Sequence, residues 1–171
     1  IFTRLGYYVF SYRDYPSLIR GGHNFNILRI SDRPVYSHQD KYDIILALDK
    51  KTVDLHKKNL KKKGFVVGKK ETDPVVAKLK GPKILANDVL MGYLFKYFGV
   101  DLKVLLTAAE KEFGKKSALI KEAIKEGYYL GKQKEKLKKS KSKYFISGNE
   151  AIGVGALAAG LDVYLAYPMT P

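Results

Sequence analysis

The sequence of 171 residues contains no cysteine. This absence excludes a disulfide framework, a zinc knuckle, cysteine-ligated iron–sulfur clusters and a thiol nucleophile within this segment. Acidic residues are scarce, since 17 Asp and Glu stand against 32 Lys and Arg and give a formal net charge of +15. Because 46% of the residues are apolar, the chain is still too hydrophobic to be a disordered polyelectrolyte. We therefore expect a folded protein that buries roughly 70% of its unfolded surface.

Long hydrophobic runs and metal-binding patterns are also missing. The most apolar stretch, Ala151–Ala166, includes the charged Asp162 and is shorter than the roughly 20 residues that a membrane helix needs. No secretory leader stands at the start, so we expect a cytoplasmic protein without a membrane partner. Neither His38 nor His56 has a second ligand at a metal-binding spacing, so we predict no metal site.

Four segments predict β-strands. Tyr7–Tyr12 and Phe25–Ile30 are rich in aromatic and β-branched residues between turn formers. Asp43–Asp49 is an apolar run between acidic residues, which is typical of a strand covered on both faces of a parallel sheet. A helix over Lys51–Lys62 and a strand at Gly64–Gly68 would complete a βαβ unit. The predicted fold class is therefore α/β, with a mainly parallel sheet and flanking helices.

Three more helices are expected after a loop that contains Pro74. The first, Asn87–Phe98, begins with an asparagine cap and is apolar almost all round, so it should be sandwiched between other elements. The other two span Asp101–Gly114 and Leu119–Tyr128, each with one apolar stripe at a period of 3.6 residues.

A lysine-rich stretch over residues 132–143 has too few apolar residues to pack and repels itself, so we expect a linker there. Beyond it, Ser147 and Glu150 have the spacing of a capping box for a helix of small residues. Strands are predicted on either side of this helix, at Tyr144–Ile146 and Val163–Ala166. A single βαβ unit cannot bury its own faces, so we expect this second domain to be incomplete and the sequence to be part of a longer protein.

The most unusual local sequence is a loop that holds Arg20, Gly21, Gly22, His23 and Asn24. Adjacent glycines let the backbone approach a partner closely, and the other three residues present a cation, a titratable ring and an amide. An anionic ligand or a subunit contact would suit this loop. The alternative is a tight connection before the next strand, with the arginine solvated.

The basic residues are spread along the chain, whereas nucleic-acid binding favours basic residues gathered on one face with aromatics free to stack. This distribution argues against a nucleic-acid partner. A cationic surface can equally attract an acidic protein or anionic small molecules through long-range steering. A basic, non-enzymatic α/β binding domain for nucleic acid or an acidic protein is therefore the alternative function.

Two groups of motifs, in this order, resemble one enzyme family. The first group, at Tyr15–Asn24, Asp43–Asp49 and Phe113–Lys116, is similar to the gamma domain of 2-oxoacid:ferredoxin oxidoreductases. The second group, at Gly148–Gly160 and Tyr167–Pro171, is similar to the start of the alpha subunit of the same enzymes. Together they cover essentially the whole chain.

The resemblance implies three parts: a gamma domain over 1–131 without its first strand and Gly-rich turn, a basic linker over 132–143, and a truncated, thiamine-enzyme-like alpha domain over 144–171. The implied reaction is the coenzyme A-dependent oxidative decarboxylation of a 2-oxoacid, with electrons passed to ferredoxin. Thiamine diphosphate with magnesium and the iron–sulfur clusters would be held mainly by a thiamine-binding beta subunit. The rest of the alpha subunit and ferredoxin are the other implied partners, and this segment alone should be inactive.

In this family a Tyr-Pro-x-Thr-Pro motif lies at the cofactor pocket. Carried over to this sequence, Thr170 contacts the substrate while Tyr167 and Pro168 shape the loop. A hydroxyl can donate to a substrate oxygen, and flanking prolines fix the loop in advance. The resemblance assigns no catalytic residue and no metal ligand to this segment. Without it, the same residues would be read as a proline-bounded turn after a strand.

Overall fold

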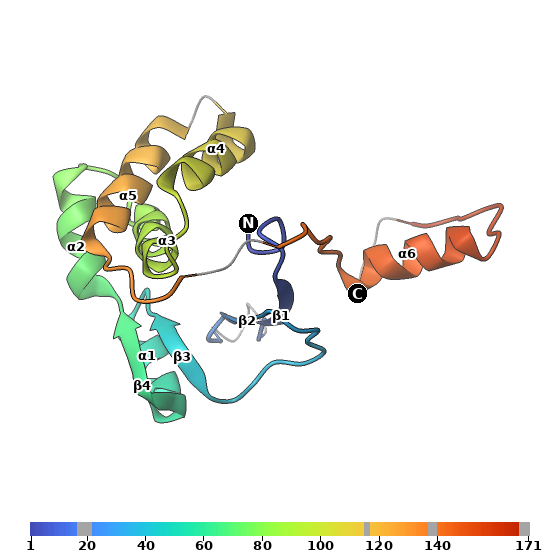
Figure 1. Cartoon of the computed structure of the whole chain (residues 1–171), viewed down its shortest axis with the longest axis horizontal. Coiled ribbons are helices and arrows are strands. Elements are labelled where there is room, and N and C mark those ends of the chain that lie inside the picture. The colour runs from blue at the N-terminus through green and yellow to red at the C-terminus, as the bar shows by residue number, and fades with distance from the viewer. Residues whose placement is uncertain (17–21, 115–116, 137–139, 168–171) are drawn as a thin grey trace.

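The computed structural model describes residues 1–16, 22–114, 117–136 and 140–167. Helices α2 to α5 gather in one bundle, the strands lie beside it, and α6 projects away from both (Figure 1). Across the described ranges, no helix is both long enough and apolar enough to cross a bilayer. The presence of both helices and strands confirms the predicted α/β class. The elements, in chain order, are β1 (Tyr8–Asp14), β2 (Phe25–Ser31), β3 (Tyr42–Leu46), α1 (Lys50–His56), the short 3-10 helix η2 (Lys57–Asn59), β4 (Leu60–Val67), α2 (Lys69–Lys78), the short 3-10 helix η3 (Lys83–Leu85), α3 (Ala86–Tyr97), α4 (Leu102–Phe113), α5 (Ser117–Leu130) and α6 (Gly148–Ala158).

The strands form two separate pairs. β1 and β2 are antiparallel, with Tyr8 opposite Ser31 and Asp14 opposite Phe25. β3 and β4 are parallel and are joined through α1, as the predicted βαβ unit requires. Parallel pairing is therefore confirmed for β3 and β4, whereas the first two predicted strands pair with each other in antiparallel fashion.

The predicted helix over Lys51–Lys62 is too long. α1 ends at His56, the 3-10 helix η2 follows, and β4 already begins at Leu60, which pairs with Tyr42. The register then shifts, so that the next paired residue of β3 is opposite Phe65. In residues 57–62, pairing with β3 outweighs the helical spacing of the apolar residues. A strand beside a half-buried neighbour gains backbone hydrogen bonds as well as burial.

The bundle is built around α3 and α5, whose backbones approach closely through glycine. A Cβ added to Gly92 would lie 2.1 Å from the carbonyl oxygen of Ile124, and one added to Gly127 would lie 2.0 Å from that of Val89. Val89, Ile124 and Leu105 of α4 are each 1% exposed. α3 also packs against α2 and α4, so its prediction as a sandwiched helix is confirmed.

The segment predicted as a loop at Pro74 contains α2 instead. The Glu71 carboxylate accepts a hydrogen bond of 2.8 Å from the backbone N–H of Gly68 and stabilises the first turn. Thr72 and Val75 are buried, and their packing outweighs the backbone hydrogen bond that a proline inside a helix removes.

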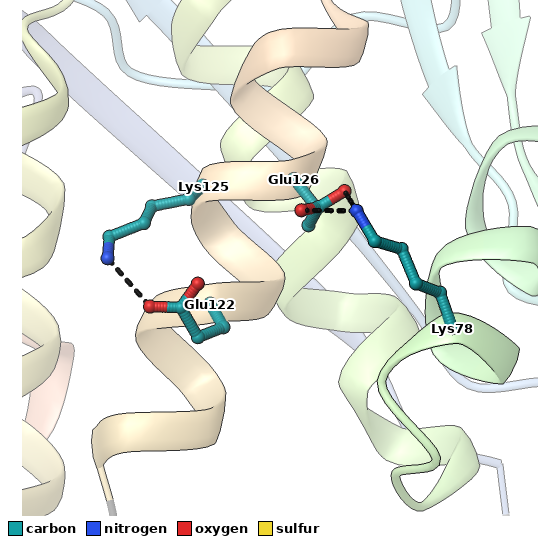
Figure 2. A network of polar contacts seen from close by, with 4 residues as sticks. All are labelled: Lys78, Glu122, Lys125 and Glu126. Carbon is teal, nitrogen blue, oxygen red and sulfur yellow. Dashed lines mark hydrogen bonds and ion pairs between the residues drawn. The ribbon is translucent and has the colours of Figure 1, made fainter.

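Charged side chains connect α2 to α5 on the outside of the bundle. The Lys78 ammonium nitrogen Nζ lies 2.8 Å from Glu126 Oε1, and along α5 the Lys125 Nζ lies 2.6 Å from Glu122 Oε1 (Figure 2). The first pair joins two residues that are 48 positions apart in the sequence.

The predicted helix caps have different outcomes. Asp101 caps α4 as predicted, since its Oδ1 accepts a hydrogen bond of 2.7 Å from the backbone N–H of Lys103. Asn87 does not cap α3 but lies inside it, and its Nδ2 donates to the carbonyl oxygen of Ile84 at 3.1 Å. The reason is that the 3-10 helix η3 leads directly into α3, so the helix begins before the asparagine.

The lysine-rich stretch over 132–143 contacts both the end of α3 and the opening turn of the chain. The backbone N–H groups of Lys134 and Glu135 both donate to the carbonyl oxygen of Tyr97, at the end of α3. Farther along, Lys143 N–H donates to the Thr3 carbonyl at 2.8 Å. The described residues of this stretch thus return to the opening turn of the chain.

The last described part contains one helix and no strand. α6 has the predicted capping box, in which the Ser147 N–H donates to Glu150 Oε2 at 2.6 Å and Glu150 N–H donates back to Ser147 Oγ at 3.2 Å. The strands predicted at Tyr144–Ile146 and Val163–Ala166 are wrong, because neither segment has a partner strand for its backbone in the described ranges. Their side chains are exposed, Tyr144 to 99% and Leu165 to 90%.

Candidate functional site

The predicted glycine loop is described from Gly22 onward, and Arg20 and Gly21 lie outside the described residues. A Cβ added to Gly22 would lie 2.1 Å from Pro16 Cγ, so glycine is required there for the close approach of the loop to itself. His23 is half-buried and Asn24 is exposed. The described end of the loop thus presents the imidazole toward the protein and the amide toward solvent.

His23 meets His56 of α1, and their Nε2 atoms are 3.2 Å apart. Phe25 lies between the two elements, with its ring centroid 5.7 Å from that of His23 and 4.7 Å from that of His56. Tyr42 of β3 adds an edge contact to His56 at 6.0 Å. Burial, reinforced by the charges of His23 and Lys58, lowers the pKa of His56. The two imidazoles therefore contact each other where the start of β2 lies beside the end of α1.

The sequence gives no signal for this pair. His23 and His56 are 33 residues apart, and each appears as an isolated histidine, one in a loop and the other on a helix. The third histidine, His38, lies elsewhere: it stacks on Tyr12 with ring centroids 4.6 Å apart, and its Nε2 is 3.8 Å from Asp40 Oδ1.

The second predicted site falls at the end of the described chain. Tyr167 is 79% exposed, whereas Pro168 and Thr170 lie outside the described residues. The apolar side chains that precede this motif are exposed as well, among them Val163 at 68% and Tyr164 at 79%.

A shallow hollow of about 340 Å³ opens where the opening turn and β1 meet the end of the lysine-rich stretch. The Lys143 Nζ lies 4.5 Å from the centre of the Tyr8 ring, a cation–π contact that holds the lysine against the wall. The hollow is lined by Thr3, Tyr7, Tyr8, Val9, Lys141, Ser142, Lys143 and Tyr144.

Neither an iron–sulfur cluster nor a multi-ligand metal centre has its ligands among the described residues of this chain. An iron–sulfur cluster is held by cysteine thiolates, and the sequence has no cysteine. Within the ranges that the structure describes, no group of three or more His, Asp or Glu side chains stands together to hold a metal ion.

Comparisons with solved structures show the same fold in larger enzymes. The chain is similar to 2-oxoglutarate:ferredoxin oxidoreductase from Magnetococcus marinus, with a TM-score of 0.80 and 22% identity over 99% of this chain and 35% of that one. It is also similar to the gamma subunit of a keto/oxoacid ferredoxin oxidoreductase from Geobacter sulfurreducens, with a TM-score of 0.57 and 19% identity. That match covers 72% of this chain and 80% of the gamma subunit.

Sequence comparisons lead to the same enzymes. Two curated relatives, the alpha subunits of 2-oxoacid:ferredoxin oxidoreductases from a Sulfolobus species and from Sulfurisphaera tokodaii, are each 24% identical over 97% of this chain. The chain spans only 36% of the length of these relatives. Residues 1–130 match the family model described as pyruvate ferredoxin/flavodoxin oxidoreductase. This chain therefore belongs to the pyruvate ferredoxin/flavodoxin oxidoreductase family.

Proposed function

We propose that this chain is the gamma domain and the beginning of the alpha domain of a 2-oxoacid:ferredoxin oxidoreductase. The enzyme would oxidatively decarboxylate a 2-oxoacid, form an acyl-coenzyme A and pass the electrons to ferredoxin. The observation that carries this proposal is the family match over residues 1–130, which ends at Leu130, the last residue of α5.

The share of the chain that each relative matches supports the proposed division of the chain. The gamma subunit from Geobacter sulfurreducens is a separate chain and resembles 72% of this one. The alpha subunits from Sulfolobus and Sulfurisphaera tokodaii resemble 97% of it. A gamma domain over 1–131 joined through residues 132–143 to an alpha domain from 144 onward accounts for both results.

Within the enzyme, this chain acts as a scaffold and positions substrate. The Thr170 hydroxyl donates a hydrogen bond to an oxygen of the 2-oxoacid, and Tyr167 and Pro168 fix the loop that carries it. Thiamine diphosphate with magnesium and the iron–sulfur clusters would be held mainly by a thiamine-binding partner subunit. The absence of cysteine from this sequence agrees with that assignment for the clusters. Thiamine diphosphate supplies the electron sink for decarboxylation when it is bound there.

The proposal is tested on the complete enzyme that contains this chain, purified with its cysteine-bearing partner. We expect ferredoxin reduction that requires both a 2-oxoacid and coenzyme A, and that disappears when either subunit is omitted. Comparison of pyruvate, 2-oxoglutarate, branched-chain and aryl 2-oxoacids then identifies the substrate. Absence of this activity, together with steeply salt-dependent binding to DNA or RNA, would instead support a basic nucleic-acid-binding domain.

A further inference from the structure

The contact between His23 and His56 has the geometry of two ligands to one metal ion. Zinc-bound imidazole nitrogens lie about 2.0–2.1 Å from the ion, so two of them are roughly 3.3 Å apart in a tetrahedral site. In an octahedral site, two neighbouring nitrogens at the same bond length are roughly 3.0 Å apart. The observed Nε2 separation of 3.2 Å falls between these values.

The two imidazoles are held from independent elements. His23 precedes β2, whereas His56 is the last residue of α1, so the fold sets the separation and chain proximity does not. Phe25 packs on both rings and Tyr42 packs on His56, which restricts their rotation. Both Nε2 atoms point toward each other within hydrogen-bond distance, and small ring rotations would aim both lone pairs at one ion.

Charged groups of both signs lie near the pair. The Asp49 carboxylate lies within electrostatic reach of His23 and Lys51, and Lys58 lies within reach of His56. One oxygen of Asp49, Oδ1, accepts hydrogen bonds of 2.7 Å from both the backbone N–H and the hydroxyl of Thr52. The carboxylate partly offsets the positive charge of the two lysines near the imidazoles.

We propose that His23 and His56 form a two-histidine site for a divalent transition-metal ion of the zinc class. Imidazole nitrogen suits zinc, copper and nickel, whereas magnesium and calcium require oxygen ligands, so the site excludes the latter two. Water or an external anion completes the coordination. A bound ion would join the β1–β2 pair to the βαβ unit of β3, α1 and β4, and would stabilise the junction between them.

The test is a titration of the full chain with Zn²⁺ alone, against a chromogenic zinc indicator at pH 7.5. The variants are His23→Ala and His56→Gln, and the matched control is His38→Ala, which removes the remaining histidine. Circular dichroism checks that each variant is folded. We expect one Zn²⁺ per wild-type chain, a loss of affinity of at least about tenfold in either pair variant, and unchanged affinity in the control.

The histidine resonances of the wild-type protein provide a second measurement, which does not depend on how the variants fold. In the wild-type protein, Zn²⁺ should shift the imidazole ¹⁵N resonances of two histidines and leave the third unchanged. Zn²⁺ should also raise the melting temperature of the wild type but not of His56→Gln. The proposal is overturned if the wild type binds no Zn²⁺, if His56→Gln binds as tightly as the wild type, or if all three histidines shift alike. These outcomes do not depend on oxidoreductase activity.

Discussion

Gly127 of α5 lies directly against the backbone of Val89 in α3, so that a Cβ on the glycine would lie 2.0 Å from the Val89 carbonyl oxygen. Backbone atoms cannot rotate away as a flexible side chain can. The position therefore requires glycine because of close approach.

We expect Gly127→Ala to destabilise the protein by about 3 kcal/mol, because α3 and α5 must move apart and open the core around Ile124. Urea unfolding measures the loss. The matched control is Gly155→Ala in α6, where an added Cβ meets no heavy atom within 4 Å. The control should not lower the unfolding midpoint and should raise helix content slightly. An unfolding midpoint for Gly127→Ala equal to that of the wild type would contradict the packing shown here.

The Lys78–Glu126 ion pair should contribute little despite its separation of 2.8 Å between Nζ and Oε1. The lysine side chain is 64% exposed, so water screens the attraction. A double-mutant cycle with Lys78→Ala and Glu126→Ala should give a coupling of about 0.2–1 kcal/mol that falls as salt is added. The Lys125–Glu122 pair on α5 serves as a comparison within one helix. A coupling that persists in 1 M salt would show that this pair is less solvated than its exposure indicates.

Asp49 caps α1, and the hydrogen bond from the backbone N–H of Thr52 is the main cause that lowers the pKa of its carboxyl below the ordinary value of 3.8. Because the folded state lowers this pKa, the stabilisation is complete above the unfolded value and is lost as the pH falls through the folded value. Asp49→Ala should cost about 1 kcal/mol at pH 7. Asp49→Asn keeps the acceptor oxygen without the charge. Denaturant unfolding between pH 7 and pH 2.5 should therefore show that the advantage of wild type over Asp49→Asn shrinks on acidification. An advantage that grows instead would contradict the direction of the shift.

In the complete enzyme, Thr170→Ala should lower kcat/KM for the 2-oxoacid by roughly ten- to a hundredfold, because one hydrogen bond to a charged substrate is lost. Thr170→Ser, which keeps the hydroxyl, should retain most of the activity. Size-exclusion chromatography should show that both variants assemble normally. Kinetics of Thr170→Ala that match those of the wild type would remove this residue from the substrate site and leave the family membership untouched.

Local patterns predicted the elements that depend on neighbouring residues. The first two strands, the cap at Asp101 and the capping box of Ser147 and Glu150 are all present, because short-range hydrogen bonds and alternation of side chains determine them. Pro74 misled the prediction, since the burial of Val75 holds α2 in spite of the proline.

The strands predicted around α6 failed for a different reason. A strand at Tyr144–Ile146 needs a partner edge, and composition alone does not supply one. The motif residues Arg20, Pro168 and Thr170 lie outside the described part of the chain, so their roles remain predictions.

The sequence by itself determined the α/β class, the basic charge, the absence of cysteine ligands and the motifs that resemble the enzyme family, because these depend on residue type and local spacing. Only the tertiary structure decided that β1 pairs with β2, that glycines let α3 and α5 touch, and that His23 meets His56. These contacts join residues far apart along the chain. Their distances follow from how the packed elements are placed, which no local pattern of side chains specifies.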